Sequence, residues 1–170
     1  MSAKSEAVRQ TLELPADHEL VITRVLHAPR KLVWRAWTER EHMMRWSCPK
    51  DFTILFCESN LRIGGAWRAG MRSPEGEEFV MGGKYCEIAP PEYLAFTHGW
   101  ENDEYHPGHV SQITVVLEEN DGGTKMIFKQ TKLATAASRD GHAEGWSGAF
   151  DNLSAYLESK GLPRAGIYRY

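Results

Sequence analysis

The strongest constraint on how this chain folds is an amphipathic stretch near its C-terminus, from Ser138 to Lys160. Its apolar residues recur at three- and four-residue intervals, which places them on one side of a helix. They are Trp146, Ala149, Phe150, Leu153, Tyr156 and Leu157. Gly161 and Pro163 follow, as is typical just beyond a helix end. A helix with one apolar face needs another element to cover that face, so the rest of the chain must supply a surface.

The segments before this helix read mostly as strands, because apolar and polar residues alternate along them. We expect a strand at residues 19–27, two short helices at 30–38 and 39–46, and further strands at 52–59, 66–72, 79–88, 93–100, 109–117 and 124–133. Turn sequences such as Asn120-Asp121-Gly122-Gly123 join neighbouring strands as hairpins, which makes the sheet antiparallel. The predicted fold is therefore α+β, with a curved antiparallel sheet of about six or seven strands wrapped around the C-terminal helix.

Length and composition favour a single soluble, cytoplasmic domain. We expect a flexible arm at residues 1–17, the domain at 18–162 and a tail at 163–170. A net charge of −3 gives no basic surface for nucleic acid. No apolar run approaches the ~20 residues of a membrane span, and the first residues lack the apolar core of a signal peptide. The three cysteines are odd in number and far apart, so reduced thiols are expected.

The N-terminal half of the predicted helix differs from the rest. His142 and Trp146 share one face there, and Gly145 and Gly148 lie beside them. A glycine inside a helix costs roughly 1 kcal/mol relative to alanine, so two so close together indicate a special role. We interpret this end of the helix as the roof of a cavity, and the C-terminal half as ordinary core.

Large apolar side chains on the predicted inner faces would line such a cavity. They are Trp67, Met71, Phe96, Trp100, Ile113, Phe128, Trp146 and Phe150. Polar residues on the same faces would orient a mainly apolar ligand, and they are His98, His109, Ser111, Gln130 and His142. Two simpler interpretations stay open: the apolar residues fill the core, and the polar residues hydrogen-bond one another, the backbone or water.

Sequence signals for catalysis, metals and cofactors are weak. The chain has no P-loop, nucleophile elbow or dinucleotide fingerprint, and we expect no cofactor. The histidines lack the short-range spacing of a zinc site, so no metal is expected. His142 and His98 are the candidate catalytic residues, because histidine can act as a base near neutral pH.

Four passages carry a family resemblance: RWSCPKDF at 45–52, NLRIGGAWR at 60–68, EIAPPEYLAFT at 87–97 and HAEGW at 142–146. In this order they resemble motifs of the family similar to the C-terminal domain of the activator of Hsp90 ATPase, within the START-like (SRPBCC), helix-grip superfamily. The resemblance extends over nearly the whole chain. It implies a curved sheet that grips the C-terminal helix over an apolar cavity.

By this resemblance, most relatives carry or sense ligands, and some are cyclases or hydrolases. We therefore expect the chain to bind a small, mainly apolar molecule (lipid-, polyketide- or aromatic-like) in the cavity. One alternative is an enzyme of cyclase, dehydratase or hydrolase type that uses a cavity histidine. Another is a protein-interaction module such as an Hsp90-type co-chaperone. Eukaryotic co-chaperones carry a further N-terminal domain for which 170 residues leave no room, so an Hsp90 homologue is not the expected partner. Exposed strand edges leave a homodimer open.

Overall fold

The computed structural model describes residues 17–160, which form one bent antiparallel sheet and three helices. The strands are β1 (Leu20–Leu26), β2 (Thr53–Ser59), β3 (Ala66–Arg72), β4 (Glu78–Ala89), β5 (Tyr93–Trp100), β6 (Ser111–Asn120) and β7 (Gly123–Thr131). The helices are α2 (Arg30–Thr38), α3 (Arg40–Met43) and α4 (Ala136–Ser159). The predicted tail and the predicted arm, apart from Asp17, lie outside the described residues.

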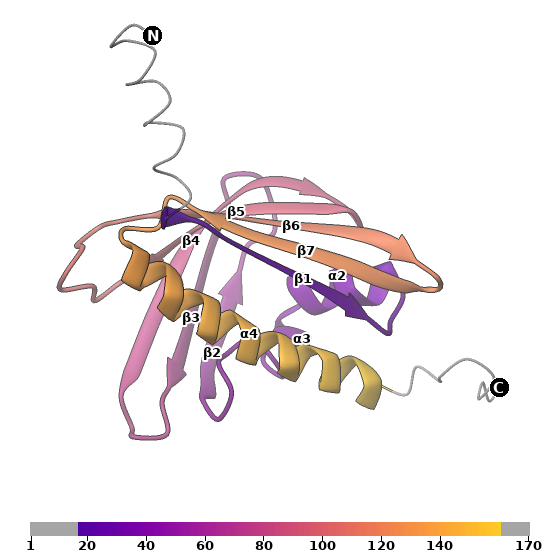
Figure 1. Cartoon of the computed structure of the whole chain (residues 1–170), viewed down its shortest axis with the longest axis horizontal. Coiled ribbons are helices and arrows are strands. Elements are labelled where there is room, and N and C mark those ends of the chain that lie inside the picture. Colours follow the sequence, from indigo (N-terminus) through magenta and orange to yellow (C-terminus); the bar gives the residue numbers. More distant parts are fainter. Residues whose placement is uncertain (1–16, 161–170) are drawn as a thin grey trace, which may run out of the picture.

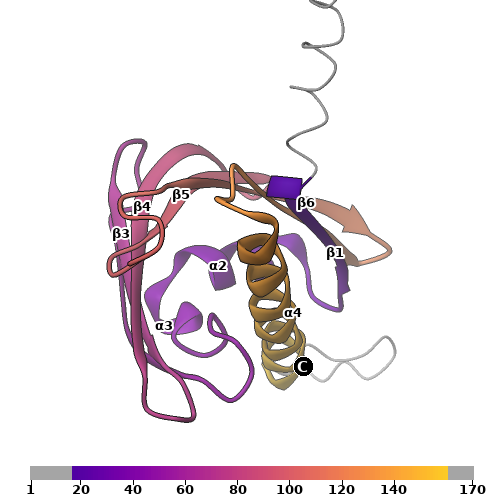
Figure 2. The same cartoon turned by 60° about the vertical axis from the view of Figure 1, so that its left-hand side comes forward.

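The sheet order is β1-β7-β6-β5-β4-β3-β2, so successive strands from β2 to β7 are neighbours and β1 adds to β7. The sheet curls around α4, which crosses its concave side (Figure 1). Figure 2 shows α2 and α3 between α4 and the wall formed by β3 and β4. This arrangement confirms the predicted α+β helix-grip fold. Among residues 17–160, no helix has both the length and the apolar character needed to cross a membrane.

Where element boundaries differ from the prediction, the cause is local. β6 begins at Ser111 rather than at residue 109, because the chain turns just before it, with Gly108 at a φ of 72°. α4 begins at Ala136 rather than at residue 138, since the Thr135 side chain accepts a hydrogen bond from the Ser138 N–H (3.0 Å) and caps the helix. The second short helix is regular over four residues only.

The hairpin turn between β6 and β7 is confirmed. Asn120 pairs with Gly123 across the turn. The two residues between them have positive φ, 49° at Asp121 and 82° at Gly122. Such a two-residue turn matches the right-handed twist of the flanking strands, so it fixes the register of the pair.

Gly83 allows a tryptophan to reach across the sheet. A β-carbon at Gly83 would overlap the Thr97 carbonyl oxygen on β5. The indole Nε1 of Trp67, which lies opposite Gly83 on β3, donates a hydrogen bond to this oxygen (2.9 Å). The Gly83 position thus marks a close approach of backbone, whereas the register shift between β4 and β5 lies further along, between Tyr85 and Glu87.

The main core packs under the C-terminal half of α4. Phe150, Leu153 and Leu157 are fully buried there, and Phe150 contacts the rings of Trp37 and Phe128. A smaller cluster lies at the β3–β4 wall, and its buried residues are Cys48, Ala69, Met71 and Met81. The N-terminal half of α4 is less covered, and it is here that the helix borders a hollow.

Candidate functional site

A hollow of about 930 Å³ lies between the N-terminal half of α4 and the wall formed by β3, β4 and β5. Met71 on β3 and Met81 on β4 are buried at its sheet side. Trp100 at the end of β5 and Trp146 on α4 are half-buried and border it from both sides. These large, adaptable side chains give the hollow a mainly apolar wall of the kind that lines small-molecule sites.

Two loops complete the rim. Residues 47–50, after α3, approach α4 so closely that a β-carbon at Gly148 would lie 2.9 Å from the Lys50 backbone nitrogen. Residues 102–105, after β5, border the hollow as well. A β-carbon at Gly141 would meet no atom within 4 Å, because this position faces open space. The helix glycines therefore have two roles: Gly148 admits the loop, and Gly141 leaves room in the hollow.

His142 on α4 is held by hydrogen bonds at both ring nitrogens. The indole Nε1–H of Trp100 donates to Nε2 of His142 (3.1 Å), so this nitrogen carries no proton. The proton therefore sits on Nδ1, which donates to the Ser138 carbonyl oxygen (2.7 Å). Burial lowers the pKa of His142, against the opposing effects of the Ser138 carbonyl and the Asp103 charge, and keeps the imidazole neutral.

His98 on β5 is 3% exposed and borders the hollow. Its ring contacts those of Trp100 (5.2 Å between centroids) and His142 (5.7 Å). Burial, with the His142 charge as a second cause, lowers its pKa from 6.5 to about 3, and only its own backbone carbonyl opposes this. No other residue in the described part of the chain hydrogen-bonds its imidazole. Because one ring nitrogen hydrogen-bonds the residue's own carbonyl oxygen, at most one nitrogen is available to a bound molecule.

Gln130 and Ser111 hydrogen-bond to each other and to their neighbours. The Trp146 indole Nε1–H donates to Oε1 of Gln130 (3.0 Å), whose Nε2 donates to Oγ of Ser111 (2.9 Å). Ser111 Oγ in turn donates to the His98 carbonyl oxygen (3.1 Å). This buried series of hydrogen bonds fixes the Trp146 ring and the backbone of His98. The sequence left two interpretations for these polar residues, contact with a ligand or hydrogen bonds to one another and to the backbone. The second describes Gln130 and Ser111.

The structure places the thirteen candidate binding residues in three settings. Met71, His98, Trp100, His142 and Trp146 border the hollow. Phe96, Ile113, Phe128 and Phe150 lie in the main core, with Ser111 and Gln130 buried nearby. Trp67 and His109 border a second hollow. Which of these residues touch a ligand stays a prediction.

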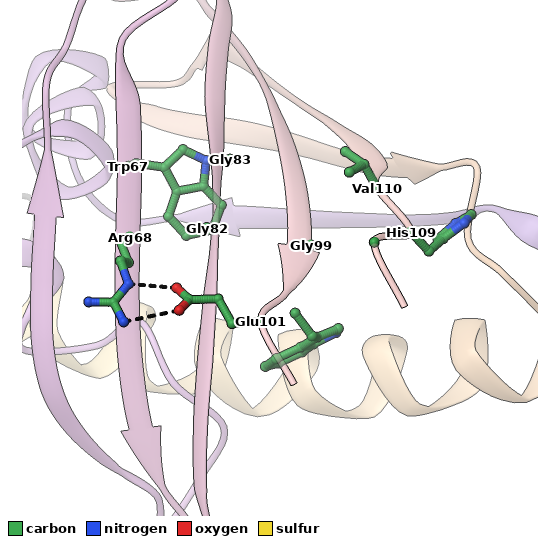
Figure 3. A pocket seen from close by; sticks show the side chains of 10 residues that line it. Trp67, Arg68, Gly82, Gly83, Gly99, Glu101, His109 and Val110 are labelled. Carbon is green, nitrogen blue, oxygen red and sulfur yellow. Dashed lines mark hydrogen bonds and ion pairs between the residues drawn. The ribbon is translucent and has the colours of Figure 1, made fainter. Parts of the chain in front are cut away.

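The second hollow, of about 310 Å³, is shown in Figure 3. Arg68 and Glu101 form a two-pronged ion pair beside it, with a shortest N–O distance of 2.5 Å. His109 is exposed, and its Nε2 contacts the Lys132 carbonyl oxygen (2.6 Å). The prediction that His109 shares the inner face assumed that β6 extends to residue 109, and the strand does not.

Several residues of the main hollow carry no distinct signal in the sequence. The 47–50 loop and the 102–105 loop come close to α4 only through the curl of the sheet. Phe79 and Met81 could have been assigned to the inner face, since they alternate along β4 in register with Met71 and Ala69. Within residues 17–160, no group of three histidine, cysteine or acidic residues is placed to hold a metal ion.

Comparison with known proteins gives a consistent result. The model of the family described as activator of Hsp90 ATPase homolog 1-like proteins matches residues 27–158. A crystal structure of a Nitrosomonas europaea protein is 29% identical, covers 85% of this chain and 97% of its own, and superposes with a TM-score of 0.71. A Chromobacterium violaceum protein is 26% identical, with 83% and 97% covered and a TM-score of 0.74. No curated protein matches the chain.

A further solved structure is that of an AHSA1 protein from Silicibacter pomeroyi. It is 22% identical, covers 84% of this chain and 99% of its own, and has a TM-score of 0.73. At this identity the likeness concerns the fold alone. The matched span includes both loops of the rim and nearly all of α4.

Proposed function

The chain belongs to the family of activator of Hsp90 ATPase homolog 1-like proteins, a START-like fold family that commonly binds ligands, and we propose that it binds a small, mainly apolar molecule between the sheet and α4. The observation that carries this proposal is the hollow of about 930 Å³ beside His98 and Trp146. Its volume lies within the roughly 300–1,000 Å³ typical of small-molecule sites. Lipid-, polyketide- and aromatic-like molecules are the classes that suit its wall.

The division of α4 supports the same proposal. Phe150, Leu153 and Leu157 are fully buried in the main core, so the helix is anchored by its C-terminal half. The N-terminal half instead presents Gly141, His142 and Trp146 to the hollow. A protein that needed only a stable core would gain from filling this space, because cavities lined by large side chains cost stability.

The geometry supports catalysis by a histidine that borders the hollow less well than it supports binding. A general base works best when its pKa lies near the working pH. Burial lowers the pKa of His98 to about 3, and both ring nitrogens of His142 already make hydrogen bonds. Loss of turnover in His98→Gln would revive the enzyme alternative. Stimulation of an Hsp90 homologue's ATPase would revive the co-chaperone alternative.

A matched pair of variants at Gly141 tests the binding proposal. Gly141→Trp adds a large side chain where a β-carbon meets open space, so it should fill the hollow without disturbing the helix. Gly141→Ala adds one methyl group and serves as the control. Native mass spectrometry of freshly purified protein should detect a bound small molecule in the wild type and in Gly141→Ala, but not in Gly141→Trp.

Titration with the uncharged dye Nile red gives an independent readout. We expect its fluorescence to rise with the wild type and Gly141→Ala, and to stay low with Gly141→Trp while the melting temperature is kept. Equal dye binding by all three proteins would place the dye elsewhere and count against the hollow. Absence of any bound molecule or dye response in the wild type would overturn the proposal.

A further inference from the structure

The two outermost strands of the sheet differ in how well their free edges are protected. Among residues 17–160, the sheet ends in β1 on one side and in β2 on the other. A free edge exposes backbone N–H and C=O groups that can pair with another strand, so proteins usually protect it with a bulge, a charge or a covering side chain. Figure 2 shows β1 at the margin of the sheet, with α4 on its concave side.

The edge of β2 is irregular and partly covered. The pairing of β2 with β3 shifts register between Ile54 and Phe56, and such a shift bends an edge strand. Arg40 Nε donates a hydrogen bond to the Cys57 carbonyl oxygen (3.0 Å), and Glu58 adds an exposed charge. An incoming strand would therefore meet a bent and charged edge.

The edge of β1 is regular and apolar. All seven residues of β1 pair with β7 without a register shift. Val21 and Val25 are 59% and 53% exposed, and the exposed Thr23 lies between them on the same face. The one charged residue within the strand, Arg24, turns to α4, where its Nη1 lies 2.8 Å from Asp151 Oδ1. Pairing with another strand would therefore not leave this charge without a partner.

The sequence of β1 complements itself when two copies run in opposite directions. If the pair is centred on Thr23, this residue faces Thr23 of the second copy, and Val21 faces Val25. Directly opposed β-branched side chains stabilise a sheet. Just beyond them, Glu19 faces the exposed His27, so a carboxylate meets an imidazole that can donate a hydrogen bond to it. By symmetry this charge-complementary pair forms at both ends of the strand.

We propose that two copies of this chain associate through β1 in this register and join their sheets into one antiparallel sheet. Every contact then occurs twice, as in other two-fold interfaces. The backbone groups that β1 directs away from β7 find partners, and the exposed valines become covered. The interface lies on the edge of the sheet, so it forms with or without a molecule in the main hollow.

Sedimentation equilibrium of the whole chain at a series of micromolar concentrations tests the association. The wild type should reach twice the mass of one chain. Val21→Lys/Val25→Lys sets two lysines against each other in each valine pair, so it should sediment as a monomer. Val21→Lys/Val25→Glu sets lysine against glutamate in the proposed register and should remain a dimer.

A matched control changes two exposed apolar residues away from this edge. Leu61→Lys/Ile63→Lys lies between β2 and β3 and should remain a dimer. Circular dichroism verifies that each variant is folded.

A cysteine at the centre of the strand tests the register. Cys86→Ser serves as the background, because Cys86 is the exposed one of the three cysteines. Thr23→Cys then places two thiols at the two-fold axis, where the facing Cα atoms are about 4.5–5.5 Å apart, within the range that a disulfide spans. Val21→Cys leaves the two thiols roughly 14 Å apart along the strands. Mild oxidation should link Thr23→Cys into a dimer on a non-reducing gel, but not Val21→Cys.

The outcomes decide the proposal directly. A wild type that stays monomeric at every concentration would overturn it, as would a dimer that persists in Val21→Lys/Val25→Lys. Equal linking of Thr23→Cys and Val21→Cys would contradict the register and overturn it too. The cysteine variants keep the test decisive even if the lysine variants fail to fold.

Discussion

Trp100 donates its indole N–H to Nε2 of His142 across the mouth of the main hollow, at 3.1 Å. The bond joins the end of β5 to the N-terminal half of α4, which are 42 residues apart in the chain. It also dictates which nitrogen of His142 carries the proton, and thereby ties the protonation of the histidine to the position of the helix.

Replacing the donor tests this coupling. In Trp100→Phe, Nε2 of His142 loses its donor and becomes free to take up a proton, so the pKa of His142 should rise. Loss of one such hydrogen bond should also lower the free energy of unfolding by about 1 kcal/mol. Histidine ring signals followed by NMR titration, together with urea unfolding, measure both effects. Trp34→Phe removes an indole whose N–H has no partner in the described residues, and an equal shift there would contradict the coupling.

His98 should make the stability of the fold depend on pH. Burial lowers its pKa from 6.5 to about 3, so between these values the unfolded chain binds a proton that the folded chain does not. The free energy of unfolding should therefore fall as the pH drops below 6.5, by about 1.4 kcal/mol per pH unit from this group. His142, whose pKa is also lowered by burial, acts in the same direction.

Urea unfolding of the wild type and His98→Gln at pH 7, 6 and 5 isolates the contribution of His98, because carboxylates titrate in both proteins. The variant should show the shallower dependence. His109→Gln changes an exposed histidine and should keep the wild-type slope. Parallel slopes for the wild type and His98→Gln would contradict the prediction.

The hydrogen bonds of Gln130 should be energetically coupled to Trp146. Gln130→Leu leaves the Trp146 N–H and the Ser111 hydroxyl without their partners, and should cost about 1–3 kcal/mol of stability. Trp146→Phe should then cost less in the Gln130→Leu background than in the wild type, since its acceptor is already gone. A double-mutant cycle by urea unfolding measures this coupling, and strict additivity would refute it.

Two helix glycines should respond to alanine with opposite signs. At Gly148 the new β-carbon would lie 2.9 Å from the Lys50 backbone nitrogen, so Gly148→Ala should destabilise the protein. At Gly141 it meets open space, and Gly141→Ala should stabilise the helix by up to about 1 kcal/mol. Thermal unfolding of the two variants is the measurement, and stabilisation of both by the same amount would be inconsistent with the close loop contact.

Alternation of residues was enough to predict which side chains share a face. In β5, Phe96 and His98 were expected on the inner face together with Trp100, and all of them point to the concave side of the sheet, where they pack on the core or border the hollow. The same reasoning assigned Phe150 to the inner face of α4, where it is fully buried. Face assignment follows from periodicity because side-chain direction is a local property of a helix or strand.

Depth within the fold could not be predicted in this way. Ile113 and Gln130 lie opposite each other on β6 and β7 and share a face with His98, yet both are fully buried and do not border the hollow, and Gln130 hydrogen-bonds Trp146. How far a residue lies from the open end depends on the bend of the sheet and the crossing of α4. The positions of the two rim loops depend on these long-range features even more, so no local pattern in the sequence marks them as neighbours of α4.

The two halves of α4 are under different constraints on their sequence. Between Ala149 and Leu157 the constraint is folding, because the buried side chains of this segment belong to the main core. Residues from Ser138 to Trp146 include those that border the main hollow, where the proposed function places the bound molecule. Under the proposed function, substitutions in the second group would change which molecule binds, while the first group, left unchanged, would preserve the fold.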